Sequence, residues 1–106
     1  MFAKIKTMLG INPAADFVAL IQQGAMIVDV RSKGEFSGGH IKGAINIPLD
    51  ELNNASNQLK DKNKIIITCC ASGMRSASGK NILSAKGYTH VYNGGGWRRL
   101  QEKISK

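Results

Sequence analysis

The sequence predicts one three-layer α/β/α domain with a mainly parallel sheet, and two features carry this prediction. Apolar, β-branched segments alternate along the chain with segments of helical periodicity. The apolar segments are almost continuous, which is typical of strands covered by helices on both faces. With 106 residues, 42% of them hydrophobic, the chain is long enough for one core and too short for two.

Eight helices and strands are expected. In order they are a helix from 12 to 24, strands at 26–30 and 44–47, a short helix beginning at 49–52, a strand at 64–69, a helix from about 75 to 86, a strand at 88–92 and a helix from 97 to about 104. Asn12 has a side chain that can cap a helix, and the fixed φ angle of Pro13 suits the first turn. Gly24 is a natural helix end. Segment 33–43 is interpreted as a glycine-rich connection, and the glycines at 94–96 as a tight turn.

The first 11 residues are interpreted as an N-terminal arm or short helix, followed by a single domain at 12–106. The arm lacks a sustained apolar stretch and a small-residue cleavage site, so it does not resemble a secretion signal. No apolar run approaches the roughly 18 residues that a membrane span needs. The cysteines, Cys69 and Cys70, are adjacent and cannot form a disulfide framework. We therefore expect a cytoplasmic protein with two free thiols.

The charge balance is +8, from 15 basic and 7 acidic residues, which raises the question of nucleic-acid binding. The lysines are spread along the chain, only Arg98 and Arg99 are adjacent, and the few aromatic residues are scattered. This distribution argues against a nucleic-acid partner. It favours a solvated basic surface that attracts small anions.

The loop after the strand at 64–69 places a thiol directly before a helix. Cys70 is followed by Ala71, Ser72, Gly73, Met74, Arg75 and Ser76. In parallel α/β folds ligands bind beyond the carboxyl ends of strands, where backbone N–H groups of a tight loop and a helix start can converge on one anion. A thiol at that point has a lowered pKa, and Arg75 adds a fixed positive charge. The segment predicts an anion cradle around a sulfur nucleophile, with a small buried core cysteine as the alternative.

Three motifs point, in order, to one family. The loop CASGMRS follows the pattern Cys-x-x-Gly-x-Arg-Ser, and the segments DVRSKGEF at 29–36 and GHIKGAINIP at 39–48 precede it. Downstream, the segment GYTHVYNGG at 87–95 is followed by Trp97. These motifs resemble the active-site loop, the upstream signature and the closing segment of the rhodanese family. The resemblance runs from about Gly24 to Leu100, and it implies a rhodanese-like fold with about five strands in the sheet.

The resemblance implies a sulfurtransferase. In the family a cysteine takes the outer sulfur of an anionic donor such as thiosulfate or a persulfide, and passes it to cyanide or to a thiol, including a protein thiol. On this resemblance Cys70 is the catalytic residue, and Ala71, Ser72, Gly73, Met74, Arg75 and Ser76 bind the substrate. Arg75 would hold the sulfite-like part of the donor or brace the loop. Asp29, Arg31 and Glu35 are expected to support the site through ion pairs and loop hydrogen bonds.

No cofactor or metal site is expected, because His40 and His90 have no ligand partner at a suitable spacing. Four residues separate Cys70 from Arg75, whereas cysteine phosphatases have five. The smaller ring suits one sulfur atom better than a tetrahedral oxyanion, so a phosphatase or arsenate reductase is the less favoured enzyme. The other alternative is a sulfur-carrier or interaction module that depends on a partner and turns over slowly alone.

Two further expectations concern the neighbours of Cys70. Many family loops carry a basic residue where this chain has Ala71, and less positive charge weakens the binding of a dianion. The natural donor is therefore hypothesised to be a persulfide or polysulfide on another molecule rather than thiosulfate. Cys69 is expected to be buried away from the loop, because consecutive side chains of a strand point in opposite directions.

Overall fold

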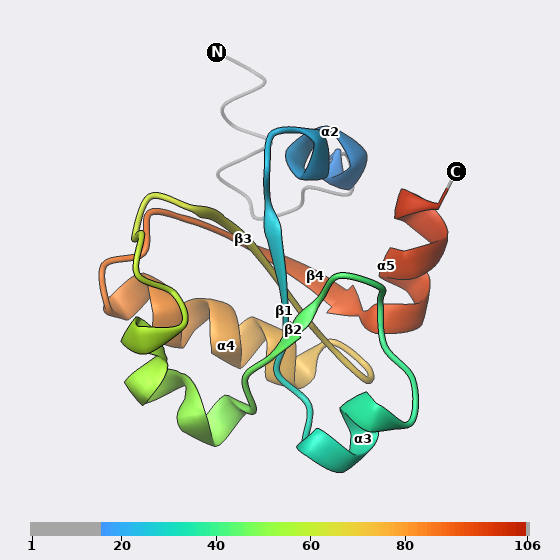
Figure 1. Cartoon of the computed structure of the whole chain (residues 1–106), viewed down its shortest axis with the longest axis horizontal. Helices are drawn as coiled ribbons and strands as arrows, with labels where there is room; N and C mark the ends of the chain where they lie inside the picture. Colours follow the sequence, from blue (N-terminus) through green and yellow to red (C-terminus); the bar gives the residue numbers. More distant parts are fainter. Residues whose placement is uncertain (1–15, 106) are drawn as a thin grey trace.

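The computed structural model describes residues 16–105, which form a parallel sheet between two layers of helices (Figure 1). The strand order is β2-β1-β3-β4, and all neighbouring pairs are parallel. The strands are β1 (Met26–Asp29), β2 (Ile45–Asn46), β3 (Ile65–Cys70) and β4 (His90–Gly96). The predicted fold class is confirmed, with four strands in the described residues against the expectation of about five.

Helices cover both faces of this sheet (Figure 1). On one face lie α4 (Met74–Ala85) and the 3-10 segment η1 (Leu49–Asn57), and on the other lie α2 (Phe17–Gln22) and α5 (Trp97–Ile104). The short helix α3 (Lys33–Ser37) follows β1 and lies beyond the carboxyl end of that strand. Within residues 16–105, no helix has the length and apolarity that a membrane crossing needs.

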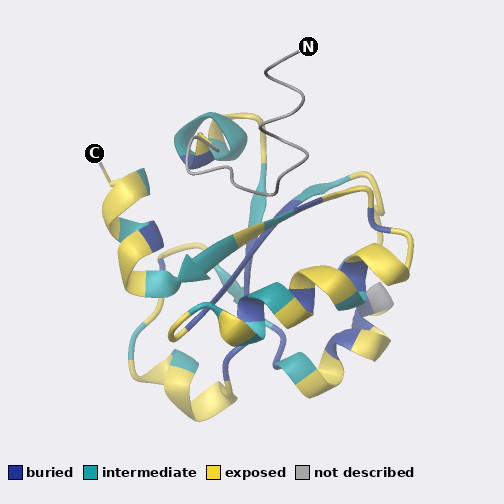
Figure 2. Cartoon of the chain, turned by 180° about the vertical axis from the view of Figure 1, so that it is seen from behind, coloured by how far each residue is buried: buried dark blue, intermediate teal, exposed yellow. Residues whose placement is uncertain are grey.

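Each face of the sheet has its own apolar cluster, and the buried residues concentrate in the strands and on the inner sides of the helices (Figure 2). Cys70 belongs to the cluster that faces α4 and η1, whereas Cys69 belongs to the cluster that faces α2 and α5. This separation follows from the alternation of side chains along a strand. It confirms that Cys69 is buried away from the loop.

Helix α2 begins inside the segment 12–24 that the sequence predicts to be a helix. Asp16 has a non-helical conformation, with φ −83° and ψ 88°, and its side chain accepts a hydrogen bond of 3.0 Å from the N–H of Ala19. Aspartate is among the preferred N-cap residues, so α2 starts at Phe17. The helix start expected at Asn12-Pro13 and the arm expected at 1–11 lie outside the described part of the chain.

The segment 33–43, interpreted from its glycines as a connection, contains the helix α3. A capping box begins this helix: the Ser32 hydroxyl accepts from the N–H of Glu35 at 3.2 Å, and the Glu35 carboxylate accepts from the N–H of Ser32 at 3.0 Å. The Ser-x-x-Glu spacing is a sequence signature of a helix start. The two reciprocal bonds compensate for the low helix propensity of the glycine within the segment.

The glycines at 94–96, predicted to form a tight turn, are the end of β4. A Cβ atom at Gly94 would lie 2.7 Å from the carbonyl oxygen of Thr68, so only glycine permits this approach of the two strands. Gly95 has φ +76°, a conformation that favours glycine. The strand register passes from Thr68–Asn93 to Cys70–Gly96, so β4 contains one extra residue, as in a β-bulge.

Candidate active site

Cys70 lies where the strand order changes direction. From β1 the chain continues to β2 on one side, and it then crosses to β3 on the other side of β1. Ligands of open α/β sheets bind at such switch points, beyond the carboxyl ends of the strands. Asp29 at the end of β1 is in register with Cys69, so the loops that follow β1 and β3 emerge from neighbouring strands (Figure 1).

The thiol of Cys70 is enclosed by the backbone of its own loop. Its Sγ atom accepts hydrogen bonds from the N–H of Gly73 at 2.9 Å and from the N–H of Ser76 at 3.2 Å. Gly73 has φ +111° and directly precedes α4, and glycine adopts this left-handed conformation without strain. The loop therefore directs N–H groups from two positions at one sulfur atom, which is the geometry of an anion site.

The two cysteines have opposite pKa shifts. Burial raises the pKa of the Cys70 thiol, but hydrogen bonds from Ser76, Gly73 and Ser72 lower it further than burial raises it, so the pKa lies below its ordinary value. Burial raises the pKa of Cys69 to about 12, and the carboxylate of Asp29 adds to this effect. The loop therefore favours the reactive thiolate form at Cys70, whereas burial disfavours it at Cys69.

We expect alkylating reagents to modify Cys70 selectively at neutral pH. Because only the thiolate reacts and the pKa of Cys70 is lowered, the rate of alkylation by iodoacetamide should reach its plateau at a lower pH than for an ordinary thiol, whose pKa is about 8.5. Cys69, whose pKa is raised to about 12 and whose side chain lies in the apolar cluster that faces α2 and α5, should stay unmodified. Peptide mass mapping of samples alkylated for fixed times over a range of pH gives both rates.

The control for this measurement is the same protein in denaturant, where both cysteines should react alike. A plateau for folded Cys70 at or above the pH found for the denatured chain would contradict the hydrogen-bonded thiolate.

A polar network behind the loop holds Ser76 in place. Its Oγ atom lies 2.6 Å from the Oδ1 atom of Asn93 and 2.9 Å from the carbonyl oxygen of Gly73. The Thr68 hydroxyl donates to the Ser76 carbonyl oxygen at 2.8 Å, and the N–H of Gly95 donates to Asn93 at 2.9 Å. Sequence reasoning assigned no site role to Asn93 or Thr68. The signal for Asn93 is a polar residue directly after the predicted strand segment 88–92, at the edge where ligands bind.

Arg31 connects the end of β1 to two helices. Its guanidinium is buried and donates to the Asp29 carboxylate, with an Nη2–Oδ2 distance of 2.7 Å and an Nε–Oδ1 distance of 2.9 Å. It also donates to the carbonyl oxygens of Gly39 at 2.7 Å and Glu35 at 3.3 Å. The carbon at the centre of the guanidinium lies 4.7 Å from the centroid of the Trp97 ring. The pair thus joins β1, the segment around α3 and the start of α5.

Arg75 and Glu35 form a second ion pair, at the surface. The two Nη atoms of Arg75 donate to the two carboxylate oxygens of Glu35 at 2.7 and 2.9 Å, and each side chain is 38% exposed. The hydrogen bonds from Arg75, followed by the one from the N–H of Ser32, lower the pKa of Glu35 to about 2. The pair joins α4 to α3, and the carboxylate offsets the charge of Arg75.

The remaining residues of the loop do not face the thiol with their side chains. Ala71 and Ser72 are exposed and line a pocket against α5, and Met74 is 81% exposed. The structure thus brings Cys70, Gly73 and Ser76 into direct contact. The other predicted residues surround this centre as ion pairs or as exposed loop.

The comparison with known families agrees with this geometry. The sequence model of the rhodanese-like domain matches residues 13–103 of the chain. The chain belongs to the rhodanese-like domain family.

Several rhodanese relatives are named for sulfur transfer. The chain is 43% identical over 74 residues to the thiosulfate sulfurtransferase PspE of Escherichia coli K12, covering 69% of this chain and 71% of that protein. It is 34% identical to the thiosulfate sulfurtransferase GlpE of Pseudomonas fluorescens SBW25, covering 71% of this chain and 68% of GlpE. Other curated relatives are longer: the chain spans 64% of the uncharacterised protein YqhL and 36% of the putative sulfur carrier YrkF, both of Bacillus subtilis 168.

Solved rhodanese structures share the fold. A rhodanese with anions from E. coli superposes with a TM-score of 0.68 at 39% identity, covering 71% of this chain and 89% of that structure. The human single-domain sulfurtransferase TSTD1 superposes with a TM-score of 0.69 at 29% identity, covering 80% of this chain and 88% of that structure.

Proposed function

We propose that the protein is a sulfurtransferase, which moves a sulfane sulfur from thiosulfate or a persulfide donor to a thiol or cyanide through a persulfide on Cys70. The observation that carries the proposal is the hydrogen bonding of the Cys70 Sγ atom by the N–H groups of Gly73 and Ser76 at the carboxyl end of β3. The names of PspE, GlpE and TSTD1 support it.

The reaction divides into two displacements at sulfur. First, the Cys70 thiolate attacks the outer sulfur of thiosulfate, the bond between the two thiosulfate sulfurs breaks, and sulfite leaves with the electron pair. Cys70 then carries a persulfide whose terminal sulfur is anionic. Second, the acceptor attacks this terminal sulfur, the persulfide bond breaks, and the Cys70 thiolate is regenerated. Because the hydrogen bonds of the loop lower the pKa of the attacking thiol and favour its ionised form, neither displacement requires a strong general base.

The loop supports this chemistry through electrostatics that exist before the donor arrives. The N–H groups that stabilise the thiolate lie at the start of α4, where the helix dipole also favours negative charge. A short loop of four residues between Cys70 and Arg75 suits a single sulfur atom better than a tetrahedral oxyanion, which favours sulfur transfer over phosphatase or arsenate reductase activity.

The acceptor and the compartment belong to the same proposal. The exposed side chain of Met74 lies within the loop, between the two cradle residues Gly73 and Ser76, and we infer that a protein thiol approaches the loop from this exposed side, as cyanide or a small thiol does. Cys69 and Cys70 are free thiols, which a reducing compartment maintains. We therefore place the reaction in the cytoplasm.

The proposal is tested by the intact mass of the reduced protein after brief exposure to thiosulfate. We expect a gain of one sulfur atom that cyanide removes and that a C70S variant does not show. If thiosulfate gives no gain, the same measurement is made with polysulfide and with a persulfide donor. Failure with all three would overturn the proposal. A stable persulfide whose turnover is slow without a partner protein would favour a sulfur carrier instead of an independent enzyme.

A further inference from the structure

Both arginines that the sequence placed in the site have their charge offset by a carboxylate. Arg31 is paired with Asp29 at 2.7 Å, and the two Nη atoms of Arg75 are paired with Glu35 at 2.7 and 2.9 Å. Ala71, directly after the nucleophile, adds no charge. An anionic donor must therefore find its cationic partner outside the set of residues that the motifs identify.

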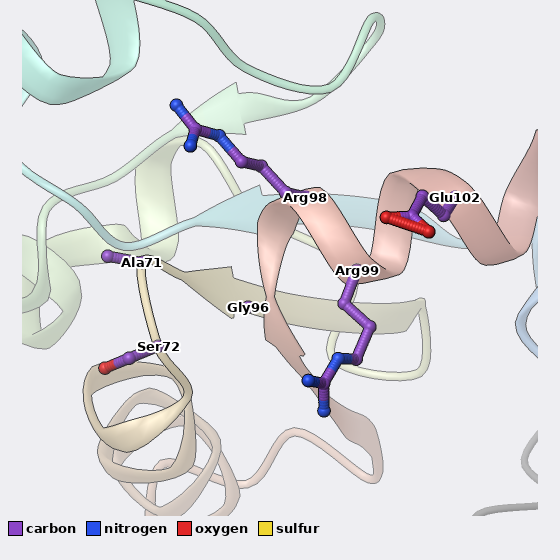
Figure 3. A pocket seen from close by; sticks show the side chains of 6 residues that line it. All are labelled: Ala71, Ser72, Gly96, Arg98, Arg99 and Glu102. Carbon is purple, nitrogen blue, oxygen red and sulfur yellow. The ribbon is translucent and has the colours of Figure 1, made fainter.

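Two further guanidinium groups lie beside the loop, in a pocket of about 450 Å³ that we call the arginine pocket. Its walls are Ala71, Ser72, Gly96, Arg98, Arg99 and Glu102. Figure 3 shows the side chains of Arg98 and Arg99 leaving the start of α5 in different directions, with Ala71 and Ser72 to the left of the helix in this view. Both arginines are exposed, and in the described part of the chain neither forms an ion pair.

The position of this pocket relative to the thiol is set by the backbone. Gly96 is the register partner of Cys70, and a Cβ atom at Gly96 would lie 3.1 Å from the carbonyl oxygen of Ala71. Helix α5 begins at the next residue, Trp97, whose ring lies over the buried guanidinium of Arg31. The first turn of α5 is thus anchored against the loop, and the arginine pocket opens beside Ala71 and Ser72, the two residues that follow the nucleophile.

The composition of the arginine pocket indicates the chemistry of its ligand. A guanidinium binds a carboxylate through two parallel hydrogen bonds, and the pocket has two guanidiniums. The third charged residue that lines the pocket is Glu102, which has no ion pair within residues 16–105. Its carboxylate suits an ammonium group. The volume falls in the range of sites that hold small organic molecules, which is more space than a thiosulfate ion fills.

We infer that the arginine pocket binds the amino-acid part of a small persulfide donor, a thiol compound with a carboxylate beside an ammonium group, while its sulfur reaches Cys70. This inference rests on the proposed function. In the transfer, the Cys70 thiolate attacks the outer sulfur of the donor R–S–SH and the S–S bond of the donor breaks. The leaving group R–S⁻ takes up the proton, and Cys70 retains the persulfide.

Carboxylate recognition is tested first, with reagents that do not require sulfur transfer. The rate of thiol–disulfide exchange at Cys70 is measured with two aromatic disulfides. One, 5,5′-dithiobis(2-nitrobenzoate), carries carboxylates, and the other, 4,4′-dithiodipyridine, does not. We expect R98Q and R99Q each to lower the ratio of the two rate constants about threefold to fivefold. The matched control is K103Q, which removes one charge from the same helix outside the pocket and should leave the ratio within about twofold.

The donor class is tested second, by the rate at which Cys70 gains sulfur from cysteine persulfide, N-acetylcysteine persulfide and thiosulfate. Substitution E102Q should lower the preference for cysteine persulfide over its acetylated form about threefold, because the acetyl group removes the ammonium. Substitutions R98Q and R99Q should slow both persulfides more than thiosulfate. An equal loss with thiosulfate would show general attraction of anions and would overturn the assignment.

The outcomes separate this inference from the proposed function. If the disulfide ratio is the same in R98Q, R99Q and the wild type, the inference is wrong even though Cys70 gains sulfur from a donor. If Cys70 gains sulfur from none of the three donors, the proposed function fails and the donor assignment falls with it, whatever the disulfide ratio. An unchanged preference in E102Q would overturn the amino-acid class.

Discussion

Replacing Cys70 with serine is expected to reduce the transfer of sulfur from thiosulfate to cyanide at least about 10³-fold. The serine hydroxyl can accept the same hydrogen bonds from Gly73 and Ser76, so the loop keeps its shape. Its pKa is far above that of a thiol, and it cannot form the S–S bond that the acceptor later breaks. The rate of thiocyanate formation, measured at saturating thiosulfate, checks this prediction.

The matched control for this variant is the neighbouring cysteine. A C69A variant removes a thiol that is fully buried in the opposite apolar cluster, and it should transfer sulfur at a rate within about twofold of the wild type if it stays folded. Thermal unfolding of both variants verifies the fold. Activity that survives in C70S, or that is lost in folded C69A, would show that Cys70 is not the nucleophile.

Breaking the buried ion pair at the end of β1 is expected to have the largest effect on stability. Asp29 is fully buried and the Arg31 side chain is 5% exposed, so R31M leaves a carboxylate without its partner away from water. Such a loss costs about 3–5 kcal/mol, a large part of the roughly 5–15 kcal/mol that holds a domain of this kind together. Urea unfolding, followed by circular dichroism, measures the difference from the wild type.

A double variant separates the charge from the contacts. In D29N/R31M neither partner leaves an unpaired charge, so it should be more stable than R31M alone, even though it has two substitutions. Substitution R75Q, which breaks the exposed pair with Glu35, should have a much smaller effect on stability, because solvent screens that pair. An R31M protein that unfolds within about 1 kcal/mol of the wild type would contradict the importance of the buried pair.

The sequence alone determined the parts of this protein that depend on local pattern. Continuous apolar segments predicted the strands and the layered fold, because a strand buried on both faces must be apolar throughout. The order of strand, cysteine, glycine and helix predicted the thiolate cradle, whose hydrogen bonds from Gly73 and Ser76 span only a few residues. The start of α3 was also encoded locally, in Ser32 and Glu35, but the glycines around them obscured it.

The tertiary structure decided which distant residues meet at the site. Arg75 pairs with Glu35 across 40 positions, and Ser76 contacts Asn93 across 17. These contacts depend on which strands are neighbours and in what register, and a one-residue bulge between β3 and β4 sets that register beside Cys70. The same bulge makes Gly96 the partner of Cys70 and brings the arginines of α5 to the loop. No local pattern contains that information, because it arises only when the strands pair.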